Sequence, residues 1–271
     1  MALGLKKSFE NKGYRVTIHC KNEWSRKHKK DSLVVVLRGL YEYTPRQEDT
    51  NFLWLISHPE KIQVGEFEKY NHIFIASEYY YKTIPNKSHI SILNQCSDPD
   101  LFYPLKIKKE YDLLFIGNSR DIYRKIIKDV FPTNYKIGII GQGWDNYIDS
   151  KYIIKSFVEN NELNVWYNKT KILLNDHWDD MREQGFVSNR IFDGLSAGCS
   201  IISDKPEGNL SLFTNTKKVH FYTSTEELND LVEKEMTSEQ NSSEAINLNT
   251  FDNCVNILLE VYDSISFKNS K

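Results

Sequence analysis

Short apolar runs separated by polar connectors mark the first part of the chain. Residues 2–12 place Leu5 and Phe9 at helical spacing and precede Gly13, a residue common just after a helix end. Residues 14–20 alternate between apolar and polar side chains, which predicts a strand. We expect further strands at residues 33–37, 52–56, 72–76 and 90–93. Such continuous apolar strands are typical of a parallel sheet covered on both faces.

A second series of strands and helices follows a polar, proline-containing stretch at residues 94–104. The pattern predicts strands at residues 111–116, 135–140, 171–175 and 200–203. It predicts helices at residues 120–130, 153–160, 164–170, 188–197 and 225–235. Residues 237–249 are polar and predict a connection to an amphipathic helix at residues 251–265.

Two successive series of this kind predict two Rossmann-like, doubly wound α/β domains with parallel sheets. We place the N-terminal domain at residues 1–96, a linker at 97–110, the C-terminal domain at 111–248 and a crossover helix at 249–271. That helix is expected to pack back on the N-terminal domain, because its apolar face needs a partner. Ligands of such sheets bind at the C-terminal ends of the strands, here in the cleft between the domains.

The amino-acid composition excludes several classes of protein. Of 271 residues, 40% are hydrophobic and 13% aromatic, which excludes wholesale disorder. Lys and Arg total 35 against 37 for Asp and Glu, and this balance argues against a nucleic-acid partner. No apolar run approaches the roughly 20 residues of a membrane span, and the N-terminus has no signal-peptide core. The 4 cysteines form no CxxC pair, so we expect reduced thiols in a cytoplasmic protein.

A basic cluster, Arg26-Lys27-His28-Lys29-Lys30, interrupts this balanced charge. It is either a solvated loop or a patch that contacts anionic lipid or a phosphate-bearing acceptor. In the second case the protein works at the inner face of the membrane.

The segment with the clearest chemistry is residues 183–204, EQGFVSNRIFDGLSAGCSIISD. Gly185 and Phe186 lead into a predicted helix whose first turn carries Ser188, Asn189 and Arg190. A helix N-terminus presents free N–H groups and the positive end of the helix dipole, and so attracts phosphate. Arg190 adds a permanent charge suited to a bidentate contact. These residues alone leave two readings, a phosphate-binding turn or ordinary packing of a helix against a strand.

The segment resembles the nucleotide-sugar site of GT-B glycosyltransferases, in particular the CgeB-like (spore-maturation type) group related to glycosyltransferase family 4. The resemblance rests on Gly185, Phe186, Ser188, Arg190, Phe192, Asp193, Leu195, Gly198 and residues 202–204. Other segments of the C-terminal half resemble that domain in the same order: 97–104, 111–118, 141–144 and 167–177. In the N-terminal half, residues 37–40 and 54–59 have looser counterparts.

The resemblance implies a GT-B fold whose C-terminal domain binds a nucleoside-diphosphate sugar and whose N-terminal domain binds the acceptor. The implied enzyme is a metal-independent glycosyltransferase with no cofactor beyond its sugar-nucleotide co-substrate. The expected acceptor is a glycan or a lipid-linked precursor in bacterial surface polysaccharide synthesis. A GT-B N-terminal domain normally begins with a strand and a glycine loop, whereas this sequence begins inside the first helix. We therefore expect the N-terminal domain to lack its first strand.

The carboxylates depart from the family 4 pattern, in which seven residues separate two glutamates. Here nine residues separate Glu183 from Asp193, so the two roles are not carried over individually. Asp193 occupies the place of the second glutamate relative to Gly198, where a carboxylate accepts ribose or sugar hydroxyls. We expect it to serve in catalysis and in donor binding.

The predicted donor site gathers glycine turns, strand ends and the start of one helix. Its residues are Gly117, Asn118, Arg120, Asn175, His177, Gly185, Phe186, Ser188, Asn189, Arg190 and Asp193. Arg120 either reaches the diphosphate or faces solvent, and for Arg124 we favour the solvent-facing position. His177 either points toward the cleft or lies on a surface loop.

On the acceptor side, His58 follows the strand predicted at residues 52–56. A neutral histidine there can accept a proton from an attacking hydroxyl, because its pKa lies near working pH. Arg38 and Glu78 follow comparable strands and are further candidates on the acceptor side. For all three residues the alternative is a structural role.

Two motifs are not assigned to a function. Asp98-Pro99-Asp100 matches the DxD metal motif of GT-A glycosyltransferases, but it lies in the predicted linker, where a turn is expected. Gly141-Gln142-Gly143 begins a dinucleotide fingerprint, but Asn146 stands where the third glycine belongs.

Two other functions remain open. A nucleotide-sugar epimerase shares the two-domain architecture and converts its donor without an acceptor. The second open function is that of an inactive, truncated glycosyltransferase that binds donor or scaffolds a partner enzyme.

Overall fold

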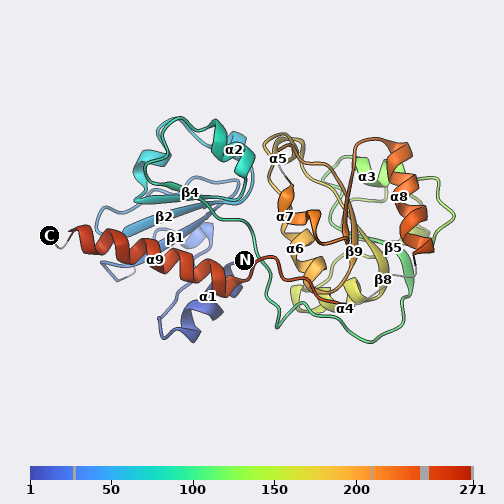
Figure 1. The fold of residues 1–271 in the computed structure, drawn as a ribbon, viewed down its shortest axis with the longest axis horizontal. Helices are drawn as coiled ribbons and strands as arrows, with labels where there is room; N and C mark the ends of the chain where they lie inside the picture. Colours follow the sequence, from blue (N-terminus) through green and yellow to red (C-terminus); the bar gives the residue numbers. More distant parts are fainter. Residues whose placement is uncertain (27–28, 209, 239–243, 270–271) are drawn as a thin grey trace.

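The computed structural model describes residues 1–26, 29–208, 210–238 and 244–269, which form two lobes (Figure 1). Each lobe is built on a parallel sheet. The N-terminal sheet has four strands in the order β1-β2-β3-β4, and the C-terminal sheet has six in the order β10-β9-β8-β5-β6-β7. The prediction of two parallel-sheet α/β domains is therefore confirmed.

The N-terminal sheet is covered on both faces, as its apolar strands predict. Its strands are β1 (Leu33–Arg38), β2 (Thr50–Leu55), β3 (His72–Ile75) and β4 (Ile90–Ile92). Phe52 and Trp54 pack against α1 (Ala2–Asn11) and α9 (Phe251–Asn269). The alternate residues Leu53 and Leu55 face the opposite side. There lie α2 (Glu78–Thr83) and also Met181 and Phe186 of the C-terminal domain.

The C-terminal sheet is likewise sandwiched between helices. Its strands are β5 (Tyr111–Ile116), β6 (Ile137–Ile140), β7 (Ile153–Lys155), β8 (Thr170–Asn175), β9 (Ser200–Asp204) and β10 (Val219–Tyr222). Side chains from α3 (Lys125–Val130) and α8 (Thr225–Thr237) bury one face, and those of α4 (Leu163–Asn168) and α6 (Asn189–Ser196) the other. The remaining helices are α5 (Asp179–Glu183), α7 (Ser211–Thr214) and the 3-10 turns Lys21–Glu23, Pro59–Lys61, Phe67–Lys69, Ser150–Tyr152 and Asn160–Glu162.

The strand order reverses at β5. The chain first adds β6 and β7 on one side of β5, then β8, β9 and β10 on the other. The connections that follow β5 and β8 therefore run in opposite directions along the sheet. Parallel sheets bind their ligands at such a switch point.

The chain crosses between the domains twice. Ser97, on the way out of the N-terminal domain, forms a parallel bridge with Thr250, on the way back. Lys7 of α1 pairs with both Asp98 and Asp100, so the Asp-Pro-Asp motif is engaged in tying the linker to α1. Within the ranges described, no helix is both long and apolar enough to cross a membrane.

Three element predictions are wrong. Residues 14–20 form no strand, because their backbone pairs with neither sheet. Residues 153–155 form the edge strand β7, where the β-branched Ile153 pairs with Ile139 of β6, so the helix predicted at 153–160 does not form. The helix predicted at 120–130 begins only at Lys125, because Arg120 and Asp121 both have φ of 60°. The short strand β10 was not predicted.

Candidate functional site

The glycine turn after β5 fits closely against the turn after β6. A Cβ on Gly141 would lie 2.2 Å from the carbonyl oxygen of Gly117, and Gly141 has φ of 148°. Both features require glycine there. The Trp144 indole donates to the Gly117 carbonyl (2.8 Å), and the Asn118 side-chain oxygen accepts from the Gln142 amide (2.9 Å). The predicted Gly117-Asn118 turn is therefore rigid and lies at the switch point.

Arg190 reaches this turn from the first turn of α6. Its guanidinium donates to Oδ1 of Asn175 at the end of β8 (2.6 Å) and lies over the Phe115 ring, 5.5 Å from its centroid. A Cβ on Gly117 would lie 3.2 Å from the guanidinium nitrogen Nη2. Asn175 is itself fixed, because its amide donates to Ser203 on β9 (2.8 Å). Among the described side chains, no carboxylate forms an ion pair with Arg190.

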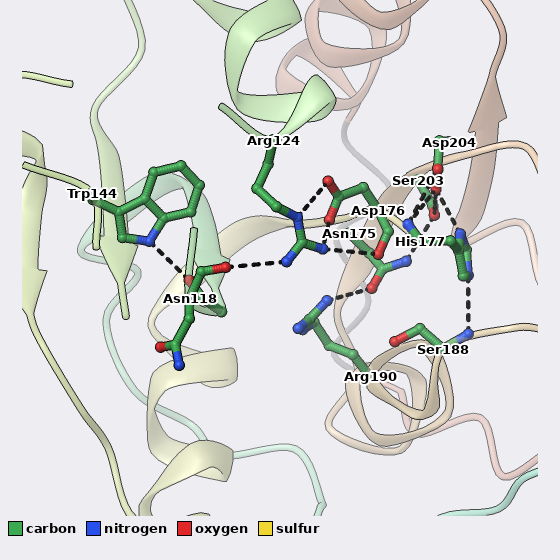
Figure 2. Close-up of polar contacts among 11 residues, drawn as sticks. Asn118, Arg124, Trp144, Asn175, Asp176, His177, Ser188, Arg190, Ser203 and Asp204 are labelled. Atoms are coloured by element: carbon green, nitrogen blue, oxygen red, sulfur yellow. Dashed lines mark hydrogen bonds and ion pairs between the residues drawn. The ribbon is translucent and has the colours of Figure 1, made fainter. Parts of the chain in front are cut away.

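Arg124 approaches the same place from the opposite side, just before α3 (Figure 2). It forms a bidentate pair with Asp176 and also donates to the Asn118 carbonyl (3.2 Å). Both partners are buried, so the expectation that Arg124 faces solvent is wrong. Burial raises the pKa of Asp176, and the charge of Arg124 opposes that shift. The charge of Arg124 is thus neutralised within the protein.

Arg120 is exposed and lies over the indole of Trp178, 4.4 Å from the ring centroid. Partial desolvation of its guanidinium and then the charges of Arg124 and Arg190 lower its pKa, which indicates three guanidinium groups close together. No acidic group of the described chain pairs directly with Arg120. Arg120 and Arg190 therefore present positive charge beside the strand ends.

His177 does not point into the cleft. Its side chain is 0% exposed, and Nδ1 lies 2.6 Å from Asp204 while Nε2 accepts the Ser188 N–H at 2.9 Å (Figure 2). Because a backbone N–H can only donate, the imidazole carries its proton on Nδ1. The prediction of direct donor contact is wrong, and His177 instead holds the loop that leads into α6.

Asn189 and Asp193 lie on the linker side of α6. The Asn189 amide donates to Asp193 (2.8 Å), and the carboxyl lies near Ser97 and the Met1 amino group. Burial raises the pKa of Asp193 to about 7. Only 9% of Asp193 is exposed, so the expected contact with sugar hydroxyls is not supported.

The loop of Gly185 and Phe186 contacts the N-terminal domain. Phe186 packs near Tyr80 of α2, and a Cβ on Gly185 would lie 2.7 Å from Cβ of Tyr79. The Ser77 hydroxyl donates to the Gln184 carbonyl (2.7 Å). These residues pack at the interface between the domains. In the sequence, the family motif was the only signal that singled out Gly185 and Phe186.

The three acceptor-side candidates have different surroundings. Arg38 is 1% exposed and paired with buried Glu66 at 2.6 Å, so it cannot contact an acceptor and the prediction is wrong. Glu78 lines a cavity of about 210 Å³ between the domains. Further lining comes from Tyr79, Asn94, Gln95, Glu207 and Leu210. His58 lies at the interface, with Nδ1 3.1 Å from Asp180 of the C-terminal domain.

Comparison with known proteins agrees with this arrangement. Residues 120–247 match a family model described as glycosyl transferase-like. A glycosyltransferase from Rickettsia africae ESF-5 superposes with a TM-score of 0.60 at 10% identity, over 81% of this chain and 71% of that one. The fold is that of GT-B glycosyltransferases. The matched segment contains Arg120, Arg124, Asn175 and Arg190.

Other solved GT-B structures are longer than this chain. TarM superposes with a TM-score of 0.54 at 10% identity, over 80% of this chain but 51% of its own. A chain of the GtfA/B complex has a TM-score of 0.49 at 13% identity, over 80% of this chain and 54% of its own. This GT-B chain thus spans about half the length of those two proteins. No curated protein matches it.

Proposed function

We propose that this protein transfers a sugar from a nucleoside-diphosphate sugar to an acceptor hydroxyl. The observation that carries the proposal is the position of Arg190. Its guanidinium lies at the switch point of the C-terminal sheet, anchored by neutral Asn175 and without a carboxylate partner in the part of the chain described. A partly desolvated cation of this kind is suited to bind an anion.

The donor diphosphate would lie between the Gly117-Asn118 turn and the start of α6. Arg190 and Arg120 supply charge from two sides, and the first backbone N–H groups of α6 supply donors and the helix dipole. These groups stabilise the diphosphate as it leaves, so the proposed reaction needs no metal on the phosphates. Arg124 and His177 support the site without touching the donor.

The acceptor would enter from the N-terminal domain. The cavity beside Glu78 is also lined by Glu207, Tyr79, Asn94 and Gln95, a polar set suited to a polyhydroxylated molecule. We propose His58, which is 18% exposed at the interface, as the base that accepts the hydroxyl proton. For Asp193 we propose only that it fixes Asn189 at the start of α6.

We also propose that the enzyme belongs to the CgeB-like group and builds a bacterial surface glycan in the cytoplasm. Its acceptor would be a glycan or lipid-linked precursor at the inner membrane face. The basic cluster of residues 26–30 would contact the membrane, although residues 27 and 28 lie outside those described.

The experiment is a thermal-shift screen with UDP, GDP, CMP and dTDP sugars, followed by calorimetric titration of the best nucleotide. A ligand that binds only the native state stabilises it by RT ln(1 + [L]/Kd), so the melting temperature rises with the concentration and affinity of the ligand. We expect one base to be preferred, with unchanged affinity in EDTA. No binding by any sugar nucleotide refutes the proposal. Conversion of the sugar nucleotide without an acceptor would instead identify an epimerase.

A further inference from the structure

A cluster of three metal-ligating side chains bridges the two domains next to the proposed site. His58 and Glu60 belong to the N-terminal domain, and Asp180 lies in the first turn of α5. Their ligand atoms all lie within 4.8 Å of one another. The cluster adjoins Trp178, whose ring centroid is 6.4 Å from that of His58.

The spacing of the ligand atoms fits a single ion. His58 Nδ1 lies 3.1 Å from Asp180 Oδ2 and 3.5 Å from Glu60 Oε1. An ion bound at about 2.1 Å by nitrogen and oxygen holds its ligands roughly 3.0 to 3.4 Å apart at right or tetrahedral angles. Small side-chain movements therefore suffice to bring all three onto one ion.

The local charge also favours a cation. The carboxylate oxygens of Glu60 and Asp180 lie within 4.8 Å of each other, so two negative charges converge beside the His58 imidazole. Two cationic side chains lie nearby: Nζ of Lys61 is 3.7 Å from Oε1 of Glu60, and the charge of Arg120 acts on Asp180. Two carboxylates this close repel each other, and a divalent cation bound by both removes that repulsion.

We propose that His58, Glu60 and Asp180 bind a divalent transition-metal ion that joins the two domains. One imidazole and two carboxylates form a mixed nitrogen and oxygen set that suits Zn²⁺ or Mn²⁺ better than Mg²⁺. Glu60 is 40% exposed, which leaves room for water as a further ligand. Because the ligands come from both domains, the ion binds the closed arrangement more tightly and shifts the population toward it.

The site is separate from the donor diphosphate. Its ligands are carboxylates and an imidazole of the protein, whereas the phosphates are assigned to Arg190, Arg120 and the start of α6. An imidazole bound to the ion through Nδ1 carries its proton on Nε2, so His58 can serve as the proposed base only while the metal site is empty. Metal binding is measured without nucleotide or acceptor, so its failure is distinguishable from failure of the proposed function.

The test is calorimetric titration of the EDTA-treated full chain with Zn²⁺, repeated with Mn²⁺ and Mg²⁺. The chain carries Cys20→Ser, since Cys20 is an exposed thiol that can bind zinc on its own. We expect one ion per chain. His58→Ala and Asp180→Asn should each weaken binding by about tenfold or more, because loss of a ligand costs at least as much as loss of its supporting contacts. His89→Ala is the matched control, since this histidine contacts Ser88 and Phe67 instead.

Scattering measurements test the bridge itself. Zn²⁺ should reduce the radius of gyration of the parent chain and leave that of Asp180→Asn unchanged, and circular dichroism checks that the variants fold. Absence of zinc binding, or equal binding by His58→Ala and the parent, overturns the proposal. The contact would then be a histidine–carboxylate hydrogen bond only.

Discussion

Replacing Arg190 by alanine tests the donor site most directly. Arg190 has no carboxylate partner in the described structure, so its charge is available to a ligand, and its one hydrogen bond goes to Asn175. Loss of a charge-assisted contact to a partly desolvated phosphate costs about 2–4 kcal/mol. Nucleotide affinity should therefore fall by roughly 30- to 1,000-fold.

The same substitution should also lower stability, for a separate reason. It leaves Oδ1 of Asn175, a fully buried residue, without its donor, which costs about 1–3 kcal/mol. Arg190→Lys should recover only part of the affinity, since an ammonium cannot contact Asn175 and a phosphate in the same planar geometry. Arg182→Ala removes a charge from α5, where Arg182 pairs with Asp179 and Glu183 on the surface, and serves as the control.

Calorimetric titration with the nucleotide found by screening separates the two effects. We expect Arg182→Ala to bind like the parent protein and Arg190→Ala to bind weakly at a temperature where it is fully folded. If Arg190→Ala melts several degrees lower but binds nucleotide as tightly as the parent, Arg190 is structural and the reasoning is refuted.

Three further predictions concern stability. Glu66→Gln leaves the Arg38 charge buried and unpaired, so the free energy of unfolding in urea should fall by about 3–5 kcal/mol; a loss below 1 kcal/mol would contradict this. Asp193 has its pKa raised to about 7, so the folded state binds more protons than the unfolded state between about pH 4 and 7. The contribution of Asp193 to stability therefore weakens as pH rises through that window. In urea unfolding between about pH 4 and 7, the free energy of unfolding of Asp193→Asn should therefore increase relative to that of the parent protein as pH rises. Gly141→Ala places a methyl group against the Gly117 carbonyl and should abolish nucleotide binding, with a lowered melting temperature.

The sequence predicted the elements whose apolar pattern reports burial directly. Residues 52–56 form a continuous apolar run and became β2, because a strand covered on both faces buries every side chain. The alternation of residues 14–20 carried the same kind of signal but failed, because a strand also needs a partner for its backbone groups. A hydrophobic pattern indicates whether a side chain prefers to be buried. It does not indicate which strand pairs with the backbone of that segment.

The sequence identified the residues of the candidate site more accurately than it identified their roles. Both Arg190 of the family motif and Asn175 at the end of its strand were assigned to the donor site, and the two side chains contact each other at the switch point. His177 was assigned to the donor, yet its two ring nitrogens are occupied by Asp204 and the Ser188 amide. The contact of His58 with Asp180 joins residues 122 positions apart, so no local pattern could have indicated it.

The position of α9 has a consequence for folding during synthesis. The core of the N-terminal domain includes Phe251, Val255 and Leu258, which are translated after the whole six-stranded sheet. Before they emerge from the ribosome, one face of β2 and β3 lacks much of its apolar cover. The C-terminal sheet, whose two core clusters lie within residues 101–248, needs none of α9 and can fold first. This dependence on α9 favours the opposite of the usual order, in which the domain made first folds first.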